Sequence, residues 1–154
     1  MIRYEPKGVT PFELDTVVLD LNGTLSVNGQ VPEGVREHVN KLKAFGFKIY
    51  LFSGDQRGTA EKIATDLGID LQKAVNMEEK ADLTAKLNPE HTVSIGNARI
   101  DIGTFKNVKL RIGTLQAEGI HIEILKYIDV LVPSINDALD LLLNPDSLCA
   151  TLRT

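Results

Sequence analysis

Short apolar runs alternate with segments whose apolar residues recur every three or four positions. Runs rich in β-branched residues are typical of strands that are buried on both faces of a parallel sheet. Such runs predict core strands at residues 16–20, 48–52, 74–75, 92–95, 108–112 and 129–132. A short antiparallel pair, at residues 2–5 and 12–15, is expected before the first of them.

The segments between these runs have helical periodicity. Ala60, Ile63, Ala64 and Leu67 follow the i, i+3, i+4, i+7 spacing of an amphipathic helix, and Gly68 ends it. Further helices are predicted from Pro32 to Gly46, after Asn76, at 99–105, at 122–126 and from Ser134 to Asn144. Strand–helix alternation predicts a three-layer, Rossmann-like α/β fold with a parallel sheet and right-handed crossovers.

A small flap is the one insertion that the pattern suggests at the first core strand. The Asn28-Gly29 dipeptide between apolar residues predicts a hairpin over residues 26–31. No other segment is long enough to form a cap over the strand ends. We therefore expect a single capless domain over residues 1–154.

Charge and cysteine usage narrow the class of protein. The net charge is −4, which gives neither the basic footprint of nucleic-acid binding nor a polybasic membrane signal. No apolar run approaches the ~18 residues of a membrane-spanning helix. A single cysteine, Cys149, cannot form an internal disulfide, and it lies in a tail that we expect to be frayed. These features favour a cytoplasmic protein.

Residues able to do chemistry stand where the predicted strands end. Asp20, Ser53 and Asn97 follow the first, second and fourth core strands, and Lys80 lies in the first turn of the helix after the third. The carboxyl ends of parallel strands share one edge of the sheet. A carboxylate can attack phosphorus, while a lysine and a hydroxyl hold the phosphate oxygens and oxygen ligands hold Mg²⁺. The arrangement predicts phosphoryl transfer.

Each of these residues taken singly also has a purely structural interpretation. Ser53-Gly54-Asp55 reads as a turn, Lys80 as part of a solvated helix face, and Asn97 and Asp101 as turn and cap residues. The three histidines are scattered and have no metal-binding spacing. The order of the residues along the chain, and their common edge, favour a site.

In this order, the residues resemble the haloacid dehalogenase (HAD) superfamily of aspartate-nucleophile phosphohydrolases, and most of all its soluble P-type ATPase-like branch. Residues 20–24 (Asp-Leu-Asn-Gly-Thr) match the first motif, Asp-x-Asp-Gly-Thr. Ser53 matches the second motif, within a string (51–60) similar to the Thr-Gly-Asp loop of the ATPases. Lys80 matches the third motif, and residues 96–101 match the fourth imperfectly.

The resemblance implies a role for each matching residue. Asp20 would be the nucleophile, Asn22 stands at the position of the general acid/base, and Lys80 completes the catalytic set. The phosphate-binding residues implied are Thr24, Ser53, Gly54 and Lys80. The Mg²⁺-binding positions implied are Asp20, Asn22, Asn97 and Asp101.

Two amides stand where the family has carboxylates. Asn22 cannot transfer a proton near pH 7, and general acid–base help is typically worth about 10²–10⁴-fold. Asn97 can offer an oxygen to Mg²⁺ but no charge. The first hypothesis is therefore a slow phosphohydrolase with weakly bound Mg²⁺, acting on a phosphorylated small molecule or a phosphoprotein.

Two alternatives stay open. A degenerate domain would bind phosphate or a protein partner without turnover. A phosphatase for a sugar-acid phosphate would resemble the capless tetrameric enzymes of the family, and a homo-oligomer is compatible with it.

Overall fold

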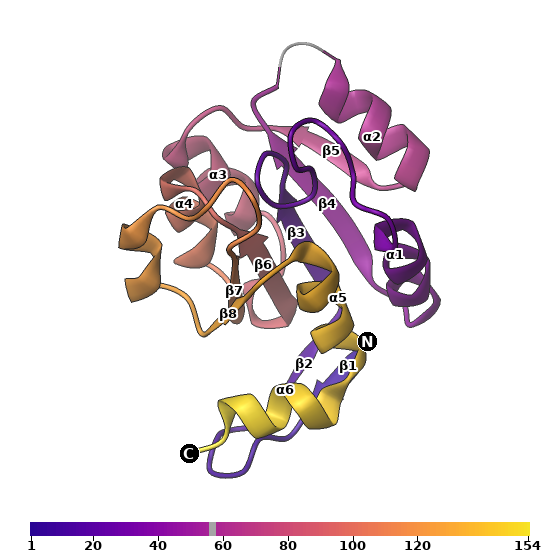
Figure 1. The fold of residues 1–154 in the computed structure, drawn as a ribbon. Coiled ribbons are helices and arrows are strands. Elements are labelled where there is room, and N and C mark those ends of the chain that lie inside the picture. The colour runs from indigo at the N-terminus through magenta and orange to yellow at the C-terminus, as the bar shows by residue number, and fades with distance from the viewer. Residues whose placement is uncertain (56–57) are drawn as a thin grey trace.

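The computed structural model describes residues 1–55 and 58–154, and its centre is a six-stranded parallel sheet (Figure 1). The strand order is β5-β4-β3-β6-β7-β8. The strands are β3 Thr16–Asp20, β4 Lys48–Ser53, β5 Asp70–Lys73, β6 Thr92–Gly96, β7 Leu110–Thr114 and β8 Val130–Val132. The parallel sheet and its α/β class confirm the fold class expected from the alternating pattern.

Helices cover both faces of the sheet and give three layers. On one face lie α1 Val35–Ala44, α2 Thr59–Leu67 and α5 Ile135–Leu143, whose buried residues share one apolar cluster with the strands. Figure 1 shows α3 and α4 on the other side of the sheet from α1 and α2. The elements of that side are α3 Met77–Ala85, α4 Ile102–Phe105 and the 3₁₀ helices η2 Arg99–Asp101 and η3 Ile122–Lys126, whereas the 3₁₀ helix η1 Pro89–His91 precedes β6 and contacts β2 (Phe12–Leu14).

Strand register brings the ends of β3, β4 and β6 to one edge. Asp20 pairs with Phe52 of β4, and Leu19 pairs with Ile95 of β6. Neighbouring strands lie about 4.8 Å apart. The residues that directly follow these three strands therefore come close together across the sheet.

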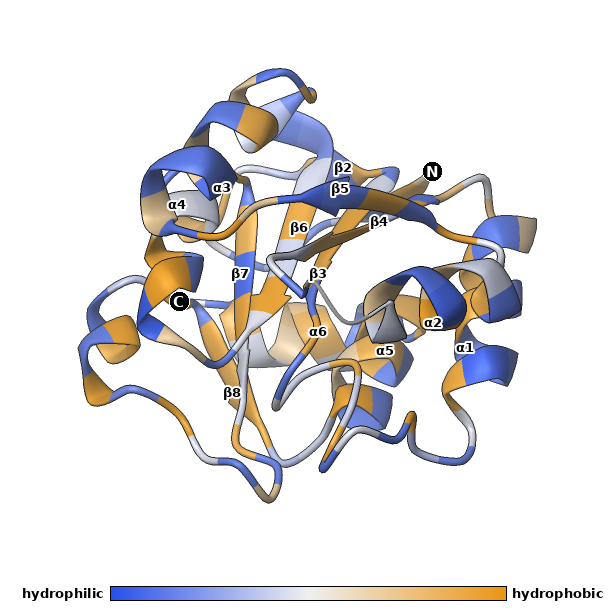
Figure 2. Cartoon of the chain, turned by 90° about the horizontal axis from the view of Figure 1, so that it is seen from above, coloured by the Kyte–Doolittle hydropathy of each residue, from blue (hydrophilic) through white to orange (hydrophobic). Residues whose placement is uncertain are grey.

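The central strands are apolar and the edge strand β5 is not. Figure 2 shows orange segments on β3, β6 and β7, whereas β5 is mostly in the hydrophilic colour. The sequence of β5 is Asp-Leu-Gln-Lys, and none of its four residues is buried. The prediction of a strand at 74–75 is therefore wrong, because an edge strand needs no apolar run.

Other boundaries also differ from the prediction. Helix α1 begins at Val35 and not at Pro32, because Gly34 has a left-handed backbone (φ 93°) that ends the preceding turn. β7 spans Leu110–Thr114, so it begins and ends two residues later than the strand predicted at 108–112. Asn76 caps α3 as expected: its Oδ1 accepts a hydrogen bond from the Glu79 N–H at 2.9 Å.

The C-terminal segment is an ordered helix and not a frayed tail. Helix α6 (Pro145–Leu152) packs against the antiparallel pair β1 (Ile2–Tyr4) and β2 (Phe12–Leu14). Leu148 is fully buried, and the Tyr4 hydroxyl donates a hydrogen bond to the Leu142 carbonyl at 2.6 Å. The expected β1–β2 pair is confirmed, and α6 covers it.

The flap is a tight turn. The backbones of Val27 and Gln30 exchange two hydrogen bonds of 2.8 and 3.1 Å, and Asn28 and Gly29 both have positive φ. Two positive φ values are typical of the type I′ turn that closes a hairpin. Between β3 and α1 the described chain holds only this flap and the turn that follows it. Within the described residues no helix is long and apolar enough to cross a membrane.

Candidate active site

A buried lysine joins two carboxylates at the carboxyl edge of the sheet. Lys80 Nζ lies 2.9 Å from Asp20 Oδ1 and 2.6 Å from Asp101 Oδ1. The lysine side chain is 1% exposed, and those of Asp20 and Asp101 are 11% and 3% exposed. Lysine is very rarely buried in this way unless it is paired. Three segments that are distant in the sequence thus meet at one cluster of charges.

Local structure explains why each group points inward. Asp20 is the last residue of β3, so its side chain stands where the strand opens into the flap loop. The Asn76 cap starts α3 four residues before Lys80, which places the lysine on the face of the first turn that packs on the sheet side. Asp101 ends η2, which directly follows the β6–η2 turn.

Both oxygens of Asp101 are used within the protein. Oδ1 accepts from Lys80, and Oδ2 accepts from the backbone N–H groups of Asn97 and Ala98 at 3.0 and 2.9 Å. This carboxylate therefore fixes the turn after β6 and the lysine together. The predicted role of Asp101 as a metal ligand stays a prediction.

The charges of the cluster shift two pKa values. Burial, with repulsion from Asp101, raises the pKa of Asp20 from 3.8 to about 7, although Lys80 opposes the change. Burial acts to lower the pKa of Lys80, but the attraction of Asp101 and Asp20 outweighs it and raises that pKa above 10.5. With all three groups ionised, one positive and two negative charges leave a net charge of −1.

Thr24 and Asn97 form a second contact beside this cluster. Thr24 Oγ1 donates to Asn97 Oδ1 at 3.3 Å, and both residues are buried. Gly23 makes the approach feasible: its φ is +75°, and a Cβ there would lie 2.2 Å from Asn97 Nδ2. Asn97 Nδ2 donates to the Gly119 carbonyl at 2.9 Å.

Ser53 and Gly54 lie on the neighbouring strand end. Ser53 is 6% exposed, and its Oγ accepts a hydrogen bond from the Asp55 N–H at 3.1 Å. Gly54 packs closely on the segment after β5, because an added Cβ would lie 2.9 Å from the Cα of Val75. The requirement for glycine at 54 thus has a packing cause. Gln56 and Arg57, part of the string similar to the ATPase loop, lie outside the described residues.

Asn22 is the exposed member of the predicted set. It lies in the loop after β3, where it forms an isolated bridge with Ser26. The structure therefore brings Asp20, Lys80 and Asp101 into direct contact and Thr24 against Asn97, with Ser53 on the adjacent strand.

The donors present fit a weakly held Mg²⁺. Asp20 offers a carboxylate near the open edge, and Asn97 offers a neutral amide oxygen. Among the described residues no three His, Cys, Asp or Glu side chains are grouped so that they could hold a metal ion. Mg²⁺ is commonly bound by one or two carboxylates, with water and substrate phosphate completing its shell. With one carboxylate and one amide oxygen, this donor set supplies only the smallest number of protein ligands typical of a Mg²⁺ site.

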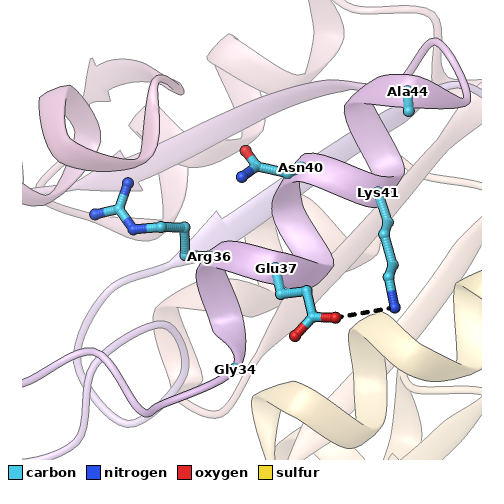
Figure 3. A pocket seen from close by; sticks show the side chains of 6 residues that line it. All are labelled: Gly34, Arg36, Glu37, Asn40, Lys41 and Ala44. Atoms are coloured by element: carbon cyan, nitrogen blue, oxygen red, sulfur yellow. Dashed lines mark ion pairs between the residues drawn. The ribbon is translucent and has the colours of Figure 1, made fainter.

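A hollow elsewhere on the molecule has no part in this cluster. It lies on the solvent-facing side of α1 and is lined by Gly34, Arg36, Glu37, Asn40, Lys41 and Ala44 (Figure 3). An ion pair of 3.3 Å joins Glu37 and Lys41 along the helix. None of the predicted site residues lines it.

The loop after β7, to which the sequence analysis assigned no role, forms hydrogen bonds with residues of the site and of the loop after β3. Thr114, Gln116, Glu118 and Gly119, at and after the end of β7, all bond to the flap loop or to Asn97. The sequence signalled only that this segment follows a strand. No residue type in it marks a contact with the loop after β3.

No family model matches the chain. It is 26% identical over 133 residues to a soluble P-type ATPase-like phosphatase of Methanocaldococcus jannaschii, which is 83% of this chain and 49% of that protein. It is 32% identical over 91 residues to a copper-exporting P-type ATPase of Staphylococcus aureus, which is 58% of this chain and 11% of the ATPase.

Solved structures share the fold. A Streptomyces avermitilis protein assigned to the HAD hydrolases has a TM-score of 0.68 at 21% identity, with 86% of each chain covered. The cobalt-bound deoxy-D-mannose-octulosonate 8-phosphate phosphatase of Haemophilus influenzae has a TM-score of 0.69 at 17% identity, over 86% of this chain and 89% of that one. The chain thus has the fold of these phosphatases and is similar in sequence to a soluble P-type ATPase-like phosphatase.

The chain spans about half the length of the curated phosphatase that it matches. The solved structures, at identities near 20%, share the fold and carry no information on the substrate of this chain.

Proposed function

We propose that this protein is a Mg²⁺-dependent phosphohydrolase of the HAD superfamily that acts through a phosphoryl group on Asp20. The contact that carries the proposal is the one of 2.9 Å between Lys80 Nζ and Asp20 Oδ1, deep at the strand edge. A lysine held there can neutralise charge on a phosphoryl group at the carboxylate. The soluble P-type ATPase-like phosphatase among its relatives supports the same activity.

The reaction has two displacements at phosphorus. An oxygen of Asp20 attacks, the bond from phosphorus to the leaving oxygen breaks, and that oxygen keeps the electron pair and takes a proton from water. Water then attacks the same phosphorus and gives a proton to the hydroxide left by the first step, while the bond from phosphorus to the Asp20 oxygen breaks, so that the carboxylate is regenerated and inorganic phosphate is released. Lys80, Thr24, Ser53 and the backbone at Gly54 would bind the phosphoryl oxygens through both steps.

A bound Mg²⁺ would offset negative charge between the carboxylate and the phosphoryl group. Asp20, the Asn22 segment and Asn97 would hold it. Asp101 would serve it indirectly, by fixing Lys80 and the turn that carries Asn97.

Turnover in this proposal is slow. Asn22 occupies the position from which an acid would protonate the leaving group and deprotonate water, and an amide does neither near pH 7. The net charge of −1 on the ionised cluster also opposes the entry of an anionic substrate before a cation is bound.

The substrate class is a phosphorylated small molecule or a phosphoprotein. Between β3 and α1 the described chain has no helix or strand that could act as a cap, which favours access for a bulky phosphate. A cytoplasmic location accompanies this proposal, because the single Cys149 fits a reducing compartment. A homo-oligomer is compatible with it.

Hydrolysis of an aryl phosphate with and without Mg²⁺ tests the proposal. Asp20→Ala abolishes the activity, and Asn22→Asp raises kcat by about 10²-fold because it restores a proton donor. Asn40→Asp, an exposed change on α1, is the matched control and leaves kcat unchanged. Equal rates for the wild type and Asp20→Ala would refute the proposal.

A second candidate is a phosphate-binding domain without turnover. The two amides at Asn22 and Asn97 favour it, because both remove charge that catalysis uses. In that case inorganic phosphate binds with Mg²⁺ and Lys80→Met abolishes the binding, while Asn22→Asp produces no activity.

A further inference from the structure

The loop after β7 holds the loop that follows β3, here called the catalytic loop, through several hydrogen bonds. Thr114 Oγ1 donates to the Gly23 carbonyl at 3.2 Å, and Gln116 Nε2 donates to the Thr24 carbonyl at 2.6 Å. The Asn28 N–H of the flap donates to Glu118 Oε2 at 3.3 Å. Figure 1 shows this loop, in orange, beside the indigo loop that follows β3.

Gln116, in this loop, forms hydrogen bonds with three other residues. Its side-chain Nε2 donates to Thr24, its Oε1 accepts from the Ile135 N–H at 3.2 Å, and its own N–H donates to the Pro133 carbonyl at 2.9 Å. Ile135 is the first residue of α5, where a backbone N–H has no partner within the helix. One side chain thus ties the catalytic loop to the start of a buried helix.

The backbone of Gln116 is held in a conformation that side chains rarely adopt. Its φ is 30°, and Asn28 is the other non-glycine residue in the described chain with a positive φ. Such a conformation costs free energy and persists where its surroundings require it. Here, the hydrogen bonds of the Gln116 side chain and backbone hold the residue in this conformation.

We propose that Gln116 is a positioning residue for the Asp20 reaction. It fixes the Thr24 carbonyl, and with it the Thr24 hydroxyl that contacts Asn97 and the short loop leading back to Asp20. Helix α5 is the rigid support, since Ile135, Ala138, Leu139 and Leu142 are fully buried in the main core. The kinetic part of this proposal rests on the proposed phosphohydrolase function.

Gln116→Glu separates positioning from folding. The carboxylate keeps the shape and the bond from Ile135 N–H, and a negative charge at a helix N-terminus is favourable. It cannot donate to the Thr24 carbonyl, and at pH 8 it is ionised and repels that oxygen. We expect the Tm to be unchanged or higher. We expect kcat to fall by about tenfold or more, with little change in KM.

Asn136→Asp is the matched control. Asn136 Nδ2 donates to the Glu33 carbonyl at 2.8 Å, so this change also removes an amide–carbonyl bond between two segments, but away from Asp20. The control keeps the wild-type kcat. An equal fall in kcat for both variants, or an unchanged kcat for Gln116→Glu in an active protein, would overturn the proposal.

Hydrogen exchange gives a readout that needs no turnover. The N–H groups of Thr24, Leu25 and Ser26 bond to the carbonyls of Asp20 and Leu21, and they exchange faster in Gln116→Glu while those of α5 do not. Unchanged exchange at these three amides refutes the role of Gln116, whatever the activity. If the wild type itself lacks Asp20-dependent activity, the phosphohydrolase proposal fails and exchange alone decides whether Gln116 holds the loop.

Discussion

Lys80 neutralises two buried carboxylates that come from different parts of the chain. Asp20 belongs to a strand end, whereas Asp101 belongs to a turn that it also caps through two backbone N–H groups. Removing the lysine would leave two acids facing each other out of water. The stability of this edge and the chemistry proposed for it therefore depend on the same nitrogen atom.

Lys80→Met is expected to abolish phosphatase activity and to destabilise the protein. Breaking a buried ion pair by removing one partner typically costs about 3–5 kcal/mol. Urea unfolding monitored by circular dichroism measures the loss at pH 8. Lys86→Met, at an exposed lysine that follows α3, is the control and shifts the unfolding midpoint little. Similar losses in the two variants would contradict the structural role of the cluster.

The raised pKa of Asp20 predicts a pH dependence of stability. Between pH 4 and 7 the native state binds a proton at Asp20 that the unfolded state does not, so unfolding becomes less favourable as the pH falls from about 7 toward 4. Asp20→Asn removes this contribution. In metal-free protein, the stability of Asp20→Asn relative to wild type is therefore greater at pH 8 than at pH 5.

Chemical unfolding at the two pH values checks this prediction. Asp82→Asn, at an exposed position on the same helix as Lys80, is the control and gives the same difference at both. A relative stability of Asp20→Asn that does not change with pH would show that Asp20 is ionised throughout.

At the scale of elements, the sequence pattern located the central strands, but it missed the polar edge strand β5 and the C-terminal helix α6. The apolar runs at 16–20, 48–52 and 92–95 correspond to β3, β4 and β6, the central strands whose ends carry Asp20, Ser53 and Asn97. β5 was placed four residues too late, because an exposed edge strand has no burial pattern to detect. The order of the candidate residues was thus readable, whereas the loop after β7 was not.

Some contacts of the site were also predictable from the sequence, and others were not. Motif order indicated that Lys80 and Asp20 share an edge, and the structure gives their separation as 2.9 Å. The two hydrogen bonds that occupy Asp101 Oδ2 come from a turn whose geometry no spacing rule specifies. The catalytic, phosphate-binding and metal-binding roles of these residues stay predictions until activity is measured.

Helix α6 provides the prediction at this scale. Leu148 is fully buried against the β1–β2 pair, so Leu148→Ala should destabilise the protein by about 2–5 kcal/mol. Denaturant unfolding measures the loss. Ser147→Ala, the exposed neighbour, is the control with an expected change near zero. A small effect of Leu148→Ala would mean that α6 contributes little to the fold.

At the scale of the whole molecule, the open strand edge predicts tolerance of substrate size. Between β3 and α1 the described chain has no helix or strand that could form a cap over this edge. A phosphopeptide and a small phosphate ester of similar leaving-group pKa should therefore have kcat/KM values within about tenfold of each other. Parallel assays with Asp20→Ala as the blank measure the ratio. A preference well beyond this range for either substrate would mean that something further encloses the site.

The two ends of the described chain fold onto each other. The β1–β2 pair is covered by α6, and the Thr154 N–H donates to the Lys7 carbonyl at 3.0 Å. During translation the apolar face of the first fourteen residues thus emerges from the ribosome long before the helix that shields it. Until residue 152 has left the exit tunnel, the nascent chain exposes a hydrophobic, aggregation-prone surface. A chaperone would be needed during that interval.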